Sequence, residues 1–267
     1  MTDCGIRDRK SAPKDKLPLQ SGIVYGPVNS RRLGRSLGIN LLPTGYKVCS
    51  FDCIYCQYGR TQVKTLTPEE KHFPTVDTVL AAVEERLKSC PRIEALTFSG
   101  NGEPTLHPEF AAIAEGVRLF RDQHTPQARL ALLSNATTCH LERVHRSMVI
   151  FDLPILKLDT AHDLMLSRLN RPAPAVTLEN ILPGLKDIPH LVIQCVLIAG
   201  RVNNAQGEPL ETWIAALSAI KPRRVQIYSL DRPTPNRSVK RISSQTLTRI
   251  ADDASRIIGV PVIPYPT

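Results

Sequence analysis

Short apolar runs and longer amphipathic stretches alternate along most of this chain, and this alternation is the feature that most restricts its fold. Each apolar run resembles a strand, and the stretch after it carries apolar residues at helical spacing. The expected strands are 37–42, 93–99, 129–134, 155–158, 191–198 and 224–228, and the expected helices are 76–88, 108–120, 141–148, 178–186, 210–220 and 245–257. Such units predict a parallel sheet with right-handed crossovers, hence an α/β fold.

The length of 267 residues and the 42% of hydrophobic residues are those of a globular protein with a real core. Residues 1–20 are polar and basic without apolar periodicity, so we expect an N-terminal arm followed by a single domain over 21–267. No apolar run approaches the roughly 20 residues of a membrane span, and the first residues contain no apolar signal region. We therefore expect a cytoplasmic protein without a membrane partner.

The chemically distinctive stretches all come directly after expected strands. Loops at the carboxyl ends of parallel strands form the active site in α/β architectures. These stretches are the cysteine-containing segment 49–56, the segment SGNGEPT at 99–105, SNATT at 134–138, KLDT at 157–160 and RVNN at 201–204. We expect them to meet at one edge of the sheet.

Three of the seven cysteines, Cys49, Cys53 and Cys56, fall within eight residues in a C-x3-C-x2-C spacing. Three soft thiolates on one short loop can converge on a metal centre, and iron–sulfur clusters are normally held by cysteines. A four-iron cubane would keep one iron open to an outside ligand. A structural zinc site would need a fourth Cys or His, commonly from a second C-x2-C, which the sequence lacks. The alternative is three incidental cysteines.

The segment 99–105 combines two glycines with the carboxylate of Glu103 directly after a strand. Glycines allow the backbone to approach a ligand closely, and a carboxylate at a strand end suits an ammonium group. The alternative for this segment alone is a plain tight turn.

Together, these motifs resemble the radical S-adenosylmethionine (SAM) superfamily. The resemblance rests on the cysteine spacing, on the aromatic Tyr55 before the third cysteine, and on the Gly-Glu-Pro loop one strand later. The stretches GPVNSRRLGRSLGIN, DCIYCQYGRT, SGNGEPTLHP, KLDT and VQIYSLDRP are similar to the branch grouped with the tRNA wyosine-base synthases. This resemblance covers roughly residues 22–235.

The resemblance implies a partial (β/α)6 barrel, a [4Fe-4S] cluster on Cys49, Cys53 and Cys56, and SAM bound to the open iron by its methionyl amine and carboxylate. It also implies a one-electron donor of the flavodoxin or ferredoxin type. The residues that match the superfamily's SAM contacts are Gly102, Glu103 and Pro104 for the methionyl amine, Tyr55 for the adenine, Ser134 and Asn135 for the ribose or carboxylate, and Lys157 and Asp159 for the ribose.

Two departures from the family pattern concern this chain. Asn101-Gly102 stands where the superfamily has a pair of glycines, which affects only the detailed hydrogen bonding. The wyosine synthases carry a second cluster on further N-terminal cysteines, whereas only Cys4 precedes the motif here. We therefore expect a relative with simpler hydrogen-atom chemistry.

The net charge of +9 is concentrated in two segments. Residues 1–36 hold eight basic and three acidic residues, and residues 221–241 hold seven basic and one acidic. Arg31, Arg32 and Arg35 could bind phosphate through bidentate contacts, or pair with carboxylates and water. RNA is one candidate substrate, with a peptide or a small metabolite as alternatives. A non-catalytic, metal-stabilised nucleic-acid-binding module and a zinc hydrolase are the other classes, and the oligomeric state is open.

Overall fold

The computed structural model describes residues 16–69, 73–90, 92–230, 234, 236 and 238–266. The strands are β1 (Val24–Ser30), β2 (Gly34–Ile39), β3 (Val48–Cys49), β4 (Val63–Lys64), β5 (Ala95–Phe98), β6 (Arg129–Ser134), β7 (Leu153–Lys157), β8 (Val192–Val196), β9 (Ile198–Gly200), β10 (Arg224–Tyr228), β11 (Val239–Arg241) and β12 (Val262–Tyr265). The helices are α1 (Val76–Ser89), α2 (Phe110–His124), α3 (Glu142–Ser147), α4 (Asp163–Leu169), α5 (Leu178–Gly184), α6 (Glu208–Ile220) and α7 (Ser244–Ile258), with short 3-10 turns η2 (Pro104–Leu106) and η3 (Met148–Ile150).

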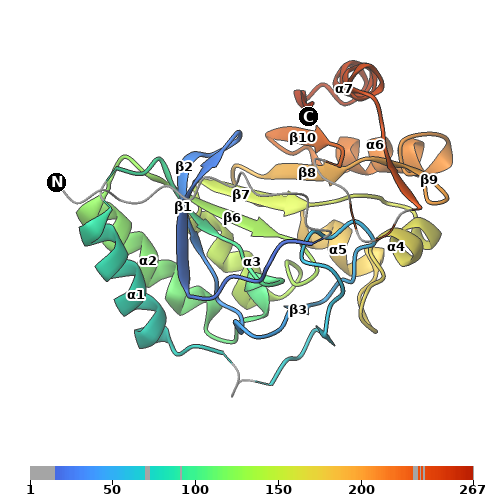
Figure 1. Ribbon diagram of the computed structural model, residues 1–267. Coiled ribbons are helices and arrows are strands. Elements are labelled where there is room, and N and C mark those ends of the chain that lie inside the picture. Colours follow the sequence, from blue (N-terminus) through green and yellow to red (C-terminus); the bar gives the residue numbers. More distant parts are fainter. Residues whose placement is uncertain are drawn as a thin grey trace.

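An eight-stranded sheet in the order β1-β2-β5-β6-β7-β8-β10-β12 forms the centre of the molecule. The β1–β2 pair is antiparallel, and each later pair in this sheet is parallel. Helices α1 and α2 pack together beside the first strands, and α6 and α7 lie beside the last ones (Figure 1). The predicted α/β fold is confirmed.

The expected strands and helices recur with small shifts at their ends, and several elements were not predicted, among them β1 and α4. Strand β1 has the sequence VYGPVNS, in which the Gly-Pro pair and a register shift interrupt the alternation of a strand. Helix α4 has only seven residues, too few to show a helical period. The expected arm falls mostly on residues 1–15, which lie outside the described residues, so the domain boundary at 20 stays a prediction.

Side chains from the turn between β1 and β2, at one edge of the sheet, form hydrogen bonds with residues at its other end. Among the described residues, β1 and β12 are not paired, so the barrel is partial. The turn between β1 and β2 crosses the opening instead. Arg31 Nη1 donates to the carbonyl oxygen of Pro266 at 2.9 Å, and Arg32 Nη1 donates to Gln194 Oε1 at 3.0 Å and Gln226 Oε1 at 3.1 Å. The hairpin turn therefore closes one side of the space inside the sheet.

Aromatic rings fill the core between the sheet and its helices. Phe98 on β5 meets Phe110 on α2 and Phe151 edge to face, with ring centroids 6.0 and 5.3 Å apart. Trp213 on α6 is buried and donates its indole N–H to the carbonyl oxygen of Leu158 at 2.8 Å. These contacts hold the carboxyl ends of the strands in place. No described helix combines the length and the apolar character needed to cross a membrane.

The segment that carries the cysteines is docked against the loop after β5. Val48 N donates to the carbonyl oxygen of Asn101 at 3.1 Å, and Glu103 N donates to the carbonyl oxygen of Val48 at 3.1 Å. Gly102 lies between these bonds with a φ of 144°. A Cβ atom at Gly102 would lie 1.6 Å from the carbonyl oxygen of Val48, so only glycine allows this approach.

We expect Gly102→Ala to lower the free energy of unfolding by about 1–3 kcal/mol, because the methyl group must push the cysteine segment away from the loop. Gly45→Ala is the matched control, since a Cβ atom there meets nothing within 4 Å. Its effect should stay within about 0.5 kcal/mol. Anaerobic denaturation followed by circular dichroism measures both, and equal stability of the two variants would contradict the docking of these segments.

Candidate active site

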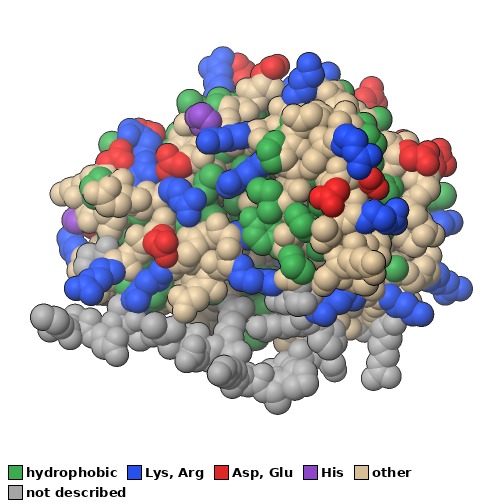
Figure 2. All heavy atoms as spheres, turned by 90° about the horizontal axis from the view of Figure 1, so that it is seen from above, with side chains coloured by type: hydrophobic (Ala, Val, Ile, Leu, Met, Phe, Trp, Pro, Cys, Tyr) green, Lys and Arg blue, Asp and Glu red, His purple; other side chains and the backbone are tan. Residues whose placement is uncertain are grey.

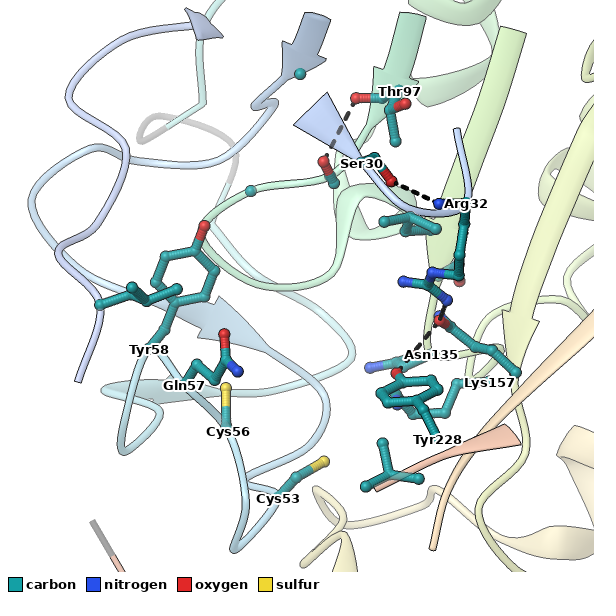
Figure 3. Close-up of a pocket in the computed structure, with 18 of the residues that line it drawn as sticks. Ser30, Arg32, Cys53, Cys56, Gln57, Tyr58, Thr97, Asn135, Lys157 and Tyr228 are labelled. Carbon is teal, nitrogen blue, oxygen red and sulfur yellow. Dashed lines mark hydrogen bonds between the residues drawn. The ribbon is translucent and has the colours of Figure 1, made fainter. Parts of the chain in front are cut away.

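One cavity of about 580 Å³ is lined both by residues at the carboxyl ends of the parallel strands and by residues at the amino end of β2. Its wall combines the cysteine segment, the loop after β5, the ends of β6, β7 and β10, and the turn between β1 and β2. Figure 3 shows Cys53 and Cys56 on one side of this space, with Arg32, Lys157 and Tyr228 on the other. The expected meeting of the strand-end loops is therefore observed for the cysteine segment and for the loops after β5, β6 and β7.

The cysteine loop is fixed at its base by the segment after α4. Ile54 N donates to the carbonyl oxygen of Leu169 at 3.0 Å, and Asp52 N donates to that of Asn170 at 2.9 Å. The carboxylate of Asp52 in turn accepts from Thr61 N at 2.8 Å. These backbone bonds satisfy polar groups that the buried loop would otherwise leave unpaired. All three cysteine side chains line the cavity.

Each of the three cysteine sulfurs accepts a hydrogen bond from a different side chain. Asn135 Nδ2 lies 3.5 Å from Cys49 Sγ, and Asn170 Nδ2 lies 3.3 Å from Cys53 Sγ. Lys47 Nζ lies 3.1 Å from Cys56 Sγ and also donates to the carbonyl oxygen of Gly59 at 3.1 Å. Hydrogen bonds to sulfur are one of the means by which proteins set the properties of iron–sulfur clusters. The sulfurs are thus surrounded by donors suited to thiolates.

Lys47 is a buried cation at this site, with only 3% of its surface exposed. Burial by itself lowers the pKa of Lys47, but the neighbouring sulfurs of Cys56, Cys49 and Cys53 together raise it above its usual value. Burial raises the pKa of the Cys49 thiol to about 12 and that of Cys53 to about 11. A coordinated metal deprotonates such thiols. Lys47 then supplies a positive charge close to them.

The carboxylate of Glu103 is buried, and burial raises its pKa while hydrogen bonds oppose this shift. Glu103 Oε1 accepts from Thr105 N at 3.1 Å and from Thr105 Oγ1 at 2.6 Å, and Oε2 accepts from Asn135 N at 2.5 Å. Gly102 and Glu103 both line the cavity, whereas Pro104 begins the turn η2 and is not among the lining residues. The carboxylate therefore joins the loops after β5 and β6 at the cavity wall.

Ser134, the last residue of β6, and Asn135, which follows it, both line the cavity. Both polar atoms of the Asn135 side-chain amide form hydrogen bonds. Its Nδ2 donates to Ser50 Oγ at 2.8 Å, and its Oδ1 accepts from Thr137 Oγ1 at 2.8 Å. Asn135 therefore connects the end of β6 to the cysteine segment.

Tyr55 meets Lys157 and Asp159, which lie about 100 residues further along the chain. The hydroxyl of Tyr55 donates to Asp159 Oδ2, and Lys157 Nζ lies 3.6 Å from Asp159 Oδ1 and 5.3 Å from the centre of the Tyr55 ring. Asn170 Nδ2 donates to the same Asp159 oxygen at 2.8 Å. Tyr55 and Lys157 line the cavity, while Asp159 lies behind them.

The three arginines of the first hairpin point in different directions. Arg31 and Arg32 both line the cavity, where Arg32 lies over the Tyr228 ring at 5.1 Å and Arg31 donates to the carbonyl oxygen of Pro266. The guanidinium of Arg35 lies instead 4.0 Å from Cys90 Sγ. Cys195, on β8, is fully buried in the core. Of the pair Gln194 and Cys195, it is Gln194 that faces the cavity.

Sequence reasoning missed Lys47 and Asn170. Lys47 stands two residues before the first cysteine and has the appearance of an ordinary surface lysine in the sequence. Asn170 follows the unpredicted helix α4, 117 residues from the cysteine that it contacts. The position of Lys47 beside a thiolate motif is a signal that could have identified it. No local pattern marks Asn170.

The donor set fits an iron–sulfur cluster. Three thiols line one cavity, each with an N–H donor. No group of three His, Cys, Asp or Glu side chains in the described part of the chain gathers as closely as a metal ion would require. A single zinc ion draws its ligands to within about 2.0–2.3 Å. A four-iron cluster binds each thiolate through a different iron, so its ligands lie further apart.

A family model described as the Radical SAM superfamily matches residues 44–223. A UPF0026 protein of Methanocaldococcus jannaschii is 32% identical over 243 residues, which cover 89% of this chain and 72% of the relative. A UPF0026 protein of Synechocystis is 32% identical over 267 residues, covering 90% of this chain and 94% of the relative.

Solved structures share the fold at low identity. A radical SAM methyltransferase from Sphaerobacter thermophilus superposes with a TM-score of 0.64 at 17% identity, over 87% of this chain and 66% of that one. The structure of TYW1 with a lysine-pyruvate adduct bound gives a TM-score of 0.58 at 14% identity, over 83% of this chain and 73% of that one.

These matches confirm the resemblance seen in the sequence and decide against a zinc hydrolase and a non-catalytic nucleic-acid-binding module. Radical SAM enzymes use a [4Fe-4S] cluster and SAM. The chain belongs to the UPF0026 family and is a radical SAM enzyme.

Proposed function

We propose that this enzyme holds its [4Fe-4S] cluster on Cys49, Cys53 and Cys56 and cleaves SAM reductively beside it. The observation that carries this assignment is that the three cysteine sulfurs line the same cavity as the Gly102-Glu103 loop, each with its own N–H donor. When bound and reduced, the cluster supplies one electron to SAM, which gives methionine and a 5′-deoxyadenosyl radical that removes a hydrogen atom from the substrate.

The chain's own residues position these groups. Lys47, Asn135 and Asn170 donate hydrogen bonds to the three sulfurs. Such bonds and the positive charge of Lys47 stabilise the negative charge of the thiolates. The contacts of Asn135 with Ser50 and Thr137 keep its amide pointed at the cysteine segment.

The SAM contacts follow from the cavity wall next to the cysteines. Glu103 offers a carboxylate to the methionyl ammonium, and the glycine at 102 lets the backbone approach it. We assign the ribose and adenine to the side of the cavity formed by Ser134, Tyr55 and Lys157. Asp159 positions two of these side chains, because it accepts a hydrogen bond from Tyr55 and pairs with Lys157. Pro104 positions Glu103, because it begins the turn η2 directly after that residue.

We expect Cys53→Ala to lose most of its iron after anaerobic reconstitution, because the described residues that line the cavity include no further Cys and no His to replace the missing ligand. Cys195→Ala is the matched control, since this cysteine is buried in the core away from the cavity wall. Iron and sulfide analysis with the absorption spectrum measures both variants. Cys53→Ala protein with full iron and full SAM cleavage would overturn the assignment of this ligand.

We expect Glu103→Gln to keep its iron but bind SAM about ten- to a hundred-fold more weakly. The change removes a charge-assisted hydrogen bond worth about 1.5–3 kcal/mol, and it places an amide NH2 against the donors that now face the carboxylate. Glu109→Gln, at an exposed position before α2, is the control. Titration calorimetry compares the two, and unchanged affinity in Glu103→Gln would remove Glu103 from the SAM site.

The reaction requires a one-electron donor, and we propose a flavodoxin or ferredoxin. The basic surface of the chain supports this choice, because small acidic redox proteins associate with positively charged partners by electrostatic steering. A cytoplasmic location is consistent with an oxygen-sensitive cluster and stays a prediction.

RNA stays the macromolecular substrate that the sequence suggests. Its support is the net charge of +9 and the basic segments at 1–36 and 221–241. In the described residues these side chains are spread out. The side chains of Arg31, Arg32 and Arg35 contact different parts of the fold, and Figure 2 shows Lys and Arg distributed over the visible face among acidic and apolar side chains.

If RNA is bound through its backbone, the logarithm of the binding constant should fall linearly with the logarithm of salt concentration, by about 0.7–0.9 per phosphate contact. Fluorescence anisotropy with labelled tRNA at increasing salt measures this slope. Absence of any salt-dependent binding by the wild-type holoenzyme would exclude RNA and leave a peptide or a small metabolite.

A further inference from the structure

The side chain of Arg32 occupies the part of the cavity that the SAM assignment leaves unused. Arg32 lies in the turn between β1 and β2, and its guanidinium reaches across the opening to β8 and β10. Figure 3 shows it pointing into the cavity above Tyr228. Its Nη1 is fixed by two glutamine oxygens, Gln194 Oε1 at 3.0 Å and Gln226 Oε1 at 3.1 Å.

This anchoring leaves one edge of the guanidinium open. Nη1 makes both glutamine contacts, so the edge formed by Nε and Nη2 has no acceptor among the described residues. That edge is the pair of parallel N–H donors that binds a carboxylate in bidentate fashion. Gln194 and Gln226 therefore hold the guanidinium of Arg32 in one orientation without a ligand.

The charge of Arg32 is also not balanced within the described residues. Its side-chain partners are neutral, namely two amides and the Tyr228 ring, and it forms no ion pair. Lys157, another basic residue of the cavity wall, is paired with Asp159 at 3.6 Å. A buried or half-buried charge without a counterion favours an anionic ligand.

Sheet topology separates Arg32 from the expected position of the SAM methionyl group. The Gly102-Glu103 loop follows β5, whereas Gln194 and Gln226 belong to β8 and β10, three and four strands further along. At about 4.8 Å per strand, this corresponds to about 14–19 Å along the curved sheet. The guanidinium of Arg32 therefore lies at the β8 and β10 side of the cavity, whereas the loop assigned to the amino acid part of SAM follows β5.

We propose that Arg32 binds the carboxylate of a small organic acid, which makes a small metabolite rather than RNA the substrate of this enzyme, an inference that rests on the proposed SAM site. A cavity of about 580 Å³ is within the range of about 300–1,000 Å³ typical of sites for one small ligand, so SAM leaves room only for a small partner. A single unbalanced guanidinium matches a single negative charge. A phosphate monoester would bring a second charge, whereas the other described cations that line the cavity are already engaged, Lys157 with Asp159, Lys47 with Cys56 and Arg31 with the carbonyl oxygen of Pro266.

The test uses reconstituted holoenzyme saturated with SAM, with sodium acetate as the carboxylate probe. Ligand-observed NMR follows the acetate methyl signal and gives a dissociation constant. Arg32→Met should weaken acetate binding at least about ten-fold, as expected for the loss of charge-assisted hydrogen bonds. Arg249→Met, at an exposed position on α7, should leave it unchanged.

A second variant separates ligand binding from a structural role of Arg32. Gln226→Glu keeps the contact to Nη1 and the bridge across the opening, but it places a carboxylate where a neutral amide now accepts. Neutralising the guanidinium in this way should also weaken acetate binding at least about ten-fold, without lowering the melting temperature. Acetate binding that is unchanged in Gln226→Glu or Arg32→Met would overturn the proposal.

Two further readouts complete the test. Inorganic phosphate should compete with acetate only weakly, and stronger binding of phosphate than of acetate would assign the site to a phosphorylated substrate instead. Iron content and SAM affinity should be unchanged in Arg32→Met. A loss of SAM affinity would place Arg32 in the SAM site and overturn the proposal, whereas wild-type protein that binds neither cluster nor SAM would refute the proposed function itself.

Discussion

The backbone contact between Val48 and the loop after β5 is the constraint on which the rest of the site depends. Two hydrogen bonds join these segments, and they form only because Gly102 has no side chain. This contact brings Cys49 next to the carboxylate of Glu103. Because Glu103 in turn accepts from Asn135 N, the loop after β6 is tied to the same point. One close approach therefore positions three loops.

Charge compensation around the cysteines is the second organising feature. Lys47 is buried beside the sulfurs, and Asp159 is buried against Tyr55, Lys157 and Asn170. Isolated charges in such surroundings are costly, and each of these has a partner or a set of hydrogen bonds. Arg32 differs because its partners are neutral amides. Near the cysteines, the described buried charges of Lys47 and Asp159 have polar or charged partners. On the other side of the cavity, the positive charge of Arg32 has only neutral partners, which favours binding of an anion there.

Local patterns in the sequence were sufficient for the α/β fold and for the motifs that line the cavity. Strands such as β6 and β10 have apolar runs whose ends coincide with the observed ones. One cavity is lined by the three cysteines, Gly102, Glu103, Ser134, Asn135, Tyr55 and Lys157. Each of these lies at the end of a strand or in the cysteine segment, so that topology alone brings them together.

The remaining parts of the site depend on contacts between distant segments. Asn170 meets Cys53 across 117 residues, and Arg32 meets Gln194 across 162 residues. No periodicity or spacing within the chain encodes such pairs. The strand β1 was missed for a related reason, since its pairing with β2 compensates for a weak local pattern. The side chains that tune or complete the site were therefore visible only in the folded structure.

In the proposed site, the three cysteines hold a cluster to which SAM has direct access in the cavity. Low-temperature electron paramagnetic resonance of the reduced holoenzyme tests it most directly. The account predicts the signal of a single reduced [4Fe-4S] cluster, with g-values that change when SAM is added. A signal that SAM leaves unaltered, in protein that carries the full cluster, would contradict the account.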